Sequence, residues 1–485
     1  MHRIVTSSLF IALGLLGAEA GCNGSDRPSS DAGLDPQHSI EVKDIPLEQN
    51  RNLDLLFVVD NSANMNAKQS NLVVNFPAFL DVLSQLPGGL PNLHLGVVTS
   101  DLGTKGAEDA AAGPGVGPLG KGRCEGLGQA GALQTGGVAT TGGAFLVDIQ
   151  DPVSDGVRIR NYTGELATAF AQMATVGDSG CGFEQSLEAM KQALLPANLA
   201  NAGFLRPAGR LAVVFVTDED DCSLSHSSLL VPSTTTLGAQ QSFRCTRFGV
   251  LCSDGGATTD AMNEVGPKGG CRPNDDSPYL TKVADYAVFL QGLRQDPKDV
   301  FVAAIAAPPE PFATELRAPT GSNAAIPSLA HSCSYVGGAG EVEVGDPPAR
   351  LKFFLDQFPD RNVLTSICQQ DQSTNLIQIA SALRTLAGDP CIQGALSDID
   401  AVAPGTQPRC TVLSVTDPDG PARTEKVLPI CTPEDASATN PPCWHITTDA
   451  TGCPNRDHFK LTIEGEATLT SDTHVVASCL IDAPM

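Results

Sequence analysis

The sequence predicts an α/β protein with a doubly wound, mostly parallel sheet and long loop insertions, followed by a small disulfide-rich, β-rich C-terminal module. Short apolar runs without polar alternation are typical of strands that are covered on both faces. The stretches between them carry apolar residues every three or four positions, which is typical of helices. Strands that alternate with helices indicate parallel crossovers. The composition then changes at Cys391, after which β-like runs are short and cysteines are frequent.

The elements follow one another along most of the chain. Apolar runs predict strands at 53–59, 93–98, 210–216 and 300–305. Apolar stripes predict helices around 72–86, 166–173, 183–194, 279–293, 349–358 and 376–386. Two Gly-rich or Cys-rich insertions, at about 101–160 and 222–277, follow strand ends, and the first contains a possible hairpin near 144–149. Because both insertions leave from carboxyl ends of strands, we expect them to cover the same edge of the sheet.

The composition limits the possible partners. The chain has 485 residues, and a formal charge of −25 arises from 30 Lys plus Arg against 55 Asp plus Glu. Nucleic acids and anionic membrane surfaces bind proteins that present positive charge. This acidic chain is therefore not expected to bind either of them.

The cysteines indicate an exported protein. There are 15 of them, and no two form a Cys-x-x-Cys pair. Structural disulfides are typical of oxidising compartments, whereas zinc ribbons and thioredoxin-like sites use paired cysteines. The sequence therefore predicts a disulfide framework.

The N-terminus predicts a signal peptide at 1–21, in which an apolar run follows His2 and Arg3. An ordinary cleavage site would end at Ala20, whereas a bacterial lipoprotein box would make Cys22 the lipidated first residue. Lipidation is favoured because it leaves an even number of cysteines for the fold. Residues 22–50 are then a flexible tether, and the protein is an outer-membrane or cell-surface lipoprotein that meets the membrane only through its lipid. Otherwise it is periplasmic or secreted.

Three oxygen-bearing side chains follow the first predicted strand at a spacing of two. They are Asp60, Ser62 and Asn64. In a loop that leaves a strand, alternate side chains can point the same way, and small oxygen ligands suit Mg²⁺. The alternative is that these are ordinary turn and helix-cap residues.

The stretch resembles the first metal-binding motif of von Willebrand factor A (VWA) domains, Asp-x-Ser-x-Ser, with Asn64 in place of the last Ser. Gly177-Asp178-Ser179 resembles the second motif of that family, Gly-x-Thr, and Thr217-Asp218 resembles the third. The three motifs occur in the family's order, and the resemblance covers residues 51–390.

The resemblance implies a metal site made by Asp60, Ser62, Asn64, Ser179 and Asp218, which would hold Mg²⁺ or else Mn²⁺ or Ca²⁺. In VWA domains the metal exchanges a water for a carboxylate of a protein partner, so the implied function is binding or adhesion without turnover. The alternative is a structural or assembly component of the cell envelope with a vestigial metal site. A Cys181–Cys222 disulfide that joins two of the motif loops is a further hypothesis.

Two other interpretations of these residues are possible. Ser179 lies in a Gly-Asp-Ser-Gly tetrapeptide like that of chymotrypsin-like proteases, but such a serine needs a histidine base. The histidines before it lie in the signal peptide, the tether and a predicted strand (His94), so we do not expect an enzyme. The acidic run 219–221 could form a Ca²⁺ site, although a solvated acidic loop is favoured.

Overall fold

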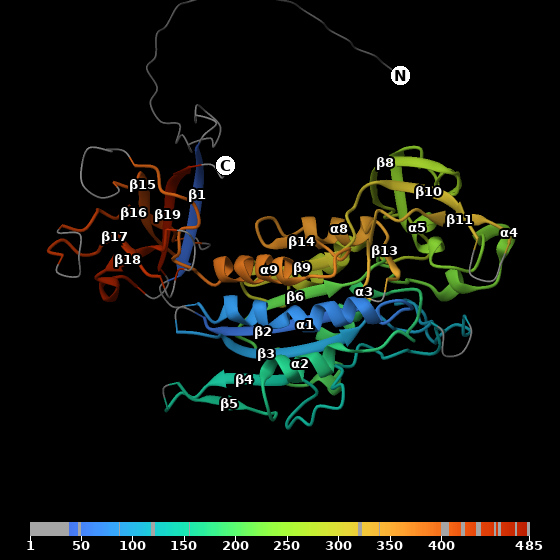
Figure 1. Ribbon diagram of the computed structural model, residues 1–485, viewed down its shortest axis with the longest axis horizontal. Helices are drawn as coiled ribbons and strands as arrows, with labels where there is room; N and C mark the ends of the chain where they lie inside the picture. The colour runs from blue at the N-terminus through green and yellow to red at the C-terminus, as the bar shows by residue number, and fades with distance from the viewer. Residues whose placement is uncertain are drawn as a thin grey trace, which may run out of the picture.

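The computed structural model (Figure 1) describes most of the chain after the N-terminal region. The described residues are 38–46, 50–86, 88–117, 122–154, 156–318, 323–338, 340–398, 407–418, 422–432, 438–450, 453, 457–470 and 473–482. The predicted signal peptide, Cys22 and the first part of the predicted tether lie outside these residues.

A seven-stranded mixed sheet forms the centre of the protein, in the order β14-β9-β6-β2-β3-β4-β5. The neighbouring pairs from β14 to β3 are parallel, whereas β4 and β5 are added antiparallel at one edge. The strands are β2 (Asn52–Val59), β3 (Asn92–Thr99), β4 (Leu146–Gln150), β5 (Arg158–Arg160), β6 (Arg210–Val216), β9 (Val300–Ala306) and β14 (Asn362–Ser366). The four strands expected from apolar runs are thus present, as β2, β3, β6 and β9.

Helices cover both faces of this sheet. One face packs on α1 (Asn66–Leu83), α2 (Leu166–Ala174) and α9 (Ser373–Leu386), and the other on α3 (Ser186–Leu194), α7 (Val283–Gln291) and α8 (Ala349–Asp356). In β2, Phe57 joins the first hydrophobic cluster and its neighbours Leu56 and Val58 join the second. A strand that is buried on both sides needs apolar residues at every position, which explains the unbroken apolar runs.

Loop insertions build a second small sheet beyond one end of the central sheet (Figure 1, green to yellow). Its order is β11-β10-β8-β7, and it combines the predicted 222–277 insertion with a later excursion that the sequence did not predict as an insertion. We call this part, with the hairpin β12–β13, the crown. Its elements are α4 (Thr234–Leu237), α5 (Phe243–Gly249), β7 (Val250–Asp254), α6 (Thr259–Met262), β8 (Gly266–Pro273), β10 (Phe312–Arg317), β11 (Ile326–Leu329), β12 (Cys333–Val336) and β13 (Val342–Gly345).

The C-terminal module lies at the other end of the molecule (Figure 1, orange to red). It holds a four-stranded sheet in the order β1-β19-β15-β16 and a separate β17–β18 pair. Its strands are β1 (His38–Pro46), β15 (Cys410–Thr416), β16 (Thr424–Val427), β17 (Cys443–Thr448), β18 (Phe459–Glu464) and β19 (Thr473–Asp482). Its six cysteines pair with one another.

Strand β1 corrects the expected tether. Residues 38–46 were placed in a flexible segment, but they pair antiparallel with β19 along their whole length. The residues Ile40, Val42 and the buried Ile45 supply β-forming side chains that compensate for the polar residues between them. The chain therefore enters the C-terminal module before it builds the central sheet.

Seven disulfides join the 14 cysteines that follow Cys22. The predicted Cys181–Cys222 disulfide is wrong, because Cys181 pairs with Cys124 and Cys222 pairs with Cys245. Each motif loop is tied to a residue of the insertion beside it, and the four cysteines share one hydrophobic cluster. In the described part of the chain, no helix has both the length and the apolar character that crossing a membrane requires.

Candidate metal centre

The carboxyl end of the central sheet gathers acidic side chains from several loops. Asp60 follows β2 and Asp218 follows β6, and these two parallel strands are neighbours, so both residues reach the same edge. We call this edge, where the loops meet the crown, the rim.

Asp60 is fully buried at the rim and is held by hydrogen-bond donors. Its Oδ1 accepts the backbone N–H of Ser62 at 2.7 Å and the hydroxyl of Ser100 at 3.3 Å, and its Oδ2 accepts the hydroxyl of Thr217 at 2.9 Å. Burial nevertheless raises the pKa of Asp60 above its ordinary value, although these hydrogen bonds oppose the shift. A buried carboxylate in this position is therefore stabilised when a cation lies nearby.

The loop after Asp60 turns sharply into α1. Ser62 is buried with Asp60, whereas Asn64 is exposed and adopts a left-handed backbone with φ of 76°. Asn tolerates this conformation better than most residues, which is a local reason for an Asn where the VWA motif has Ser. Asn64 lines the same pocket as Asp218.

The loop at 177–182 is bound to the Asp60 loop by Gln69 of α1. The Gln69 amide donates to the carbonyl oxygens of Asp60 at 2.9 Å and Gly177 at 2.7 Å. Gly180 donates to the Asn61 carbonyl, and a Cβ on Gly180 would lie 2.2 Å from the Asn61 side-chain oxygen, so a larger residue would have to displace that side chain. Ser179 itself is exposed, whereas Asp60 and Ser62 are buried. Of the five predicted ligands, Asn64 and Asp218 line the rim pocket.

Glu184, which was not among the predicted site residues, reaches the rim from the same loop. It lies just before α3, its side chain is 1% exposed, and it lines the pocket with Asp218 and Glu219. Among the described residues, its Oε1 has no hydrogen-bond partner, and the same holds for Oδ1 of Asp218. Buried oxygen atoms without donors are costly, and a cation would remove that cost.

The carboxylates raise one another's pKa because they are close and shielded from water. Burial and, after it, the charge of Asp60 raise the pKa of Asp218 to about 7. Burial followed by the charges of Asp346 and Asp218 raises the pKa of Glu219 to about 8. The pKa of Glu184 rises well above its ordinary value through burial and then through Glu219. Without a further cation, the rim must bind protons near neutral pH.

One cation is already built into the rim, and it comes from α1. The Lys68 ammonium is 2.9 Å from Asp218 Oδ2 and 2.5 Å from Glu343 Oε2 of β13, and its side chain is fully buried. It also donates to the carbonyl of Asn64 at 3.3 Å. Burial alone would lower the pKa of Lys68, but the two carboxylates raise it overall. Lys68 is therefore charged and neutralises part of the rim.

The donor set determines which metal would fit. In the described part of the chain, no three His, Cys, Asp or Glu side chains are grouped so that they could hold a metal ion. A metal would have to use one or two carboxylates with hydroxyl oxygens and water, which is how Mg²⁺ is bound in proteins. Asp60, Ser62 and Asp218 offer that chemistry, and the oxygen atom of Glu184 that lacks a donor adds to it. Of the five predicted ligands, Ser179 has the weakest structural support.

The histidine that a serine protease would need lies elsewhere. His94 pairs with Asp54 at the amino end of the parallel strands, six residues before Asp60, which corresponds to about 20 Å along a strand. Its Nδ1 contacts the carbonyl oxygen of Phe204 at 2.8 Å.

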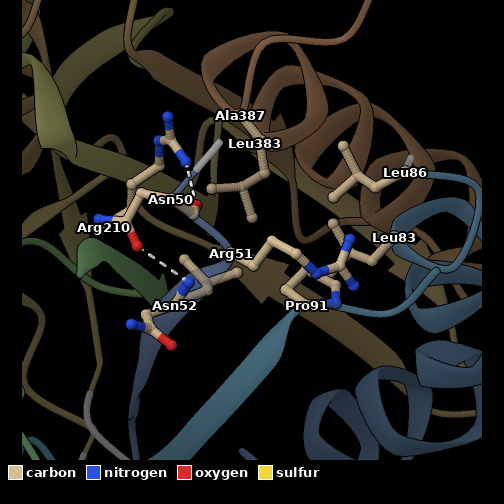
Figure 2. A pocket seen from close by; sticks show the side chains of 10 residues that line it. Asn50, Arg51, Asn52, Leu83, Leu86, Pro91, Arg210, Leu383 and Ala387 are labelled. Atoms are coloured by element: carbon tan, nitrogen blue, oxygen red, sulfur yellow. Dashed lines mark hydrogen bonds between the residues drawn. The ribbon is translucent and has the colours of Figure 1, made fainter. Parts of the chain in front are cut away.

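A second cavity, of about 30 Å³, lies at the amino end of the sheet (Figure 2). Its walls include Leu53, Leu83 and Leu383, and Arg51 crosses it to bind the carbonyl oxygens of Gly88, Gly89 and Leu90. This cavity would hold about one water by volume, so it is a packing gap and not a ligand site.

Comparisons with known proteins give weak similarities only. No protein-family model and no curated protein matches the chain. Solved structures that it resembles include a von Willebrand factor type A protein from Catenulispora acidiphila, with 9% identity, 93% of this chain and 66% of that chain covered, and a TM-score of 0.27. Another is the conserved hypothetical protein BatB from Bacteroides thetaiotaomicron, with 8% identity, 69% of this chain and 98% of that chain covered, and a TM-score of 0.26. A third is the pilus adhesin RrgA from Streptococcus pneumoniae, with 11% identity, 93% of this chain and 60% of that chain covered, and a TM-score of 0.27. The chain thus spans about two thirds or less of the first and third of these structures. Its structural neighbours are VWA-type proteins and adhesins, and similarity this weak assigns no family.

Proposed function

We propose that this chain is an exported, non-catalytic binding protein of VWA type that engages a protein partner at its acidic rim. The observation that carries the proposal is the convergence of Asp60, Glu184 and Asp218 on one edge, with two buried carboxylate oxygens that lack donors among the described residues. Buried carboxylate oxygens that accept no hydrogen bond are rare unless they serve a ligand or a metal.

A divalent cation, Mg²⁺ first and Mn²⁺ or Ca²⁺ otherwise, would be held by Asp60, Ser62 and Asp218, with Glu184 beside them. Bound there, the ion would offer a coordination position to a carboxylate of the partner. The chain's own residues prepare the position. Ser100 and Thr217 fix the orientation of the Asp60 carboxylate.

A scaffold role without metal is the second candidate, and Lys68 favours it. Its ammonium already bonds Asp218, a predicted ligand, so it supplies positive charge where the ion would act. In this case the rim is a vestigial metal site that no longer binds an ion, and the protein would serve in assembly of the cell envelope.

Titration calorimetry of the oxidised, mature chain with Mg²⁺, Mn²⁺ and Ca²⁺ distinguishes the two candidates. We expect the wild type to bind one ion and Asp60→Asn to bind it at least tenfold more weakly. Asp81→Asn is the matched control, because Asp81 is an exposed carboxylate on α1. Null titrations of both wild type and Asp60→Asn would leave only the scaffold candidate.

Export and lipidation are a separate part of the proposal. Seven disulfides support an oxidising compartment, and all 14 cysteines after Cys22 are used by them, which leaves Cys22 for the lipid. We expect Cys22→Ser to move the protein from the membrane fraction to the soluble fraction. An unchanged membrane fraction would contradict the lipid anchor.

A further inference from the structure

The rim pocket is larger than a metal ion requires. Its volume is about 280 Å³, and it is bounded by the end of β6, the start of α5, and residues of β11 and β13. At roughly 30 Å³ of liquid volume for each water, this corresponds to about nine waters. Asp218 lines this pocket whereas Asp60 and Ser62 do not, so an ion held by these three residues would lie at its edge and leave room for an extended side chain.

The pocket is lined by more acidic than basic side chains. The acidic ones are Glu184, Asp218, Glu219, Asp220 and Asp346, and the basic ones are Arg317 and His331. His331 contacts Asp346 at 2.5 Å, and Arg317 is paired with Glu315, so both basic side chains already have acidic partners.

Glu184 marks where a further cation would bind. Its carboxyl lies within hydrogen-bonding reach of Glu219, which supplies no positive charge. Its Oε1 is buried and has no donor among the described residues. Among the described residues no three acidic, His or Cys side chains are grouped so that they could hold a bare ion, so a cation with several N–H donors spread over a few ångströms suits these carboxylates.

One part of the pocket wall is apolar, beside the polar side chains of Gln241, Ser242, Thr246 and Ser328. Phe243 and Leu329, together with the Cys222–Cys245 disulfide, line it beside the carboxylates. Acidic groups beside an apolar patch suit an amphipathic side chain, because Lys and Arg bury their aliphatic stems while the charged head is paired. Lys68 already shows the pairing within this chain, with its ammonium on Asp218.

We propose that the rim pocket binds the guanidinium or ammonium group of an Arg or Lys side chain of the partner protein, with Glu184 and Glu219 as its acceptors and Phe243 and Leu329 along its stem. This rests on the proposed function, because it assigns a partner residue to the same rim. It does not require the metal.

The test uses the oxidised, mature chain in EDTA and capped single residues as probes. N-acetyl-arginine N-methylamide is expected to bind, and its neutral counterpart N-acetyl-citrulline N-methylamide to bind at least tenfold more weakly, in NMR or calorimetric titrations. Glu184→Gln is expected to weaken the arginine probe about tenfold, which corresponds to one charge-assisted hydrogen bond. Asp81→Asn should leave its affinity unchanged. If Glu184→Gln does not fold, as judged by circular dichroism and disulfide content, Glu219→Gln takes its place.

Equal affinities for the two probes, or an affinity that neither substitution changes, would overturn the proposal. Tighter binding of spermidine than of the arginine probe would overturn its assignment to a protein side chain. Because the titration is done in EDTA, its failure is distinct from failure of the metal proposal, which is measured by adding ions without any probe.

Discussion

Replacement of Lys68 by Met tests how the rim balances its charge. The substitution removes the buried ammonium and leaves Asp218 and Glu343 without their shared cation. Breaking a buried ion pair by removing one partner costs about 3–5 kcal/mol. Asp218 can take up a proton readily, because its pKa is already about 7, so we expect the lower end, about 3 kcal/mol, in EDTA.

That loss converts to a measurable change in melting temperature. An unfolding entropy of about 2.1 cal/mol/K per residue gives roughly 0.7 kcal/mol/K for a unit of about 340 residues. Lys68→Met should therefore melt about 4 °C below the wild type in scanning calorimetry with EDTA. Saturating Mg²⁺ should reduce the difference, since the ion replaces the missing positive charge.

Lys352→Met is the matched control. Lys352 pairs with Asp356 at 2.5 Å one turn along α8, but its side chain is 37% exposed. Such surface pairs contribute about 0.3–0.5 kcal/mol, so its melting temperature should fall by less than 1 °C. If the two variants melt at the same temperature in EDTA, the Lys68 ammonium does not stabilise the rim carboxylates.

Three further predictions concern the rim and the C-terminal module. In calorimetric titrations, Glu184→Gln should weaken Mg²⁺ binding severalfold, whereas Ser179→Ala should leave it unchanged. If Ser179→Ala weakens Mg²⁺ binding and Glu184→Gln does not, Ser179 is a ligand, as the sequence motif predicts. In EDTA, the folded state should lose stability as the pH rises from about 4 to 8, because folded Asp218 and Glu219, with pKa of about 7 and about 8, keep protons that the unfolded chain releases near pH 4. Added Mg²⁺ should make the melting temperature depend less on pH. A melting temperature in EDTA that stays constant or rises with pH would contradict this prediction. Deletion of residues 38–46 should expose the edge of β19 and lower the melting temperature of the C-terminal module, and unchanged melting would argue against the pairing.

The local parts of the fold could be predicted from the sequence because their signals are local. The run 210–216 is buried at every position in β6, and its lack of alternation follows from coverage on both faces. Asp60 and Asp218 could be placed together because neighbouring parallel strands end at one edge.

The position of Glu184 at the rim could not be predicted, because it depends on a contact between two loops that are far apart in the sequence. The close packing of Gly180 on Asn61 directs the chain so that the residues before α3, and not Ser179, face the rim. Glu343 and Asp346 arrive from a hairpin nearly 300 residues after Asp60, and no local pattern marks them.

The position of Lys68 in the sequence indicates that an acidic side chain lies near it. Lys68 is the third residue of α1, where a positive charge opposes the helix dipole and needs a compensating acid. A lysine in the first turn, four residues after the motif, therefore indicates a nearby carboxylate. The strand at 38–46 was missed because its polar residues resemble a tether, and its partner β19 lies at the far end of the chain.

The proposed divalent cation between Asp60 and Asp218 can be located by anomalous diffraction from crystals of the oxidised protein soaked in MnCl₂. We predict one strong peak within direct or water-mediated reach of Asp60, Ser62 and Asp218, and its loss in Asp60→Asn crystals. An empty rim, with Lys68 still paired to Asp218 at saturating Mn²⁺, would contradict the claim and favour the metal-free scaffold.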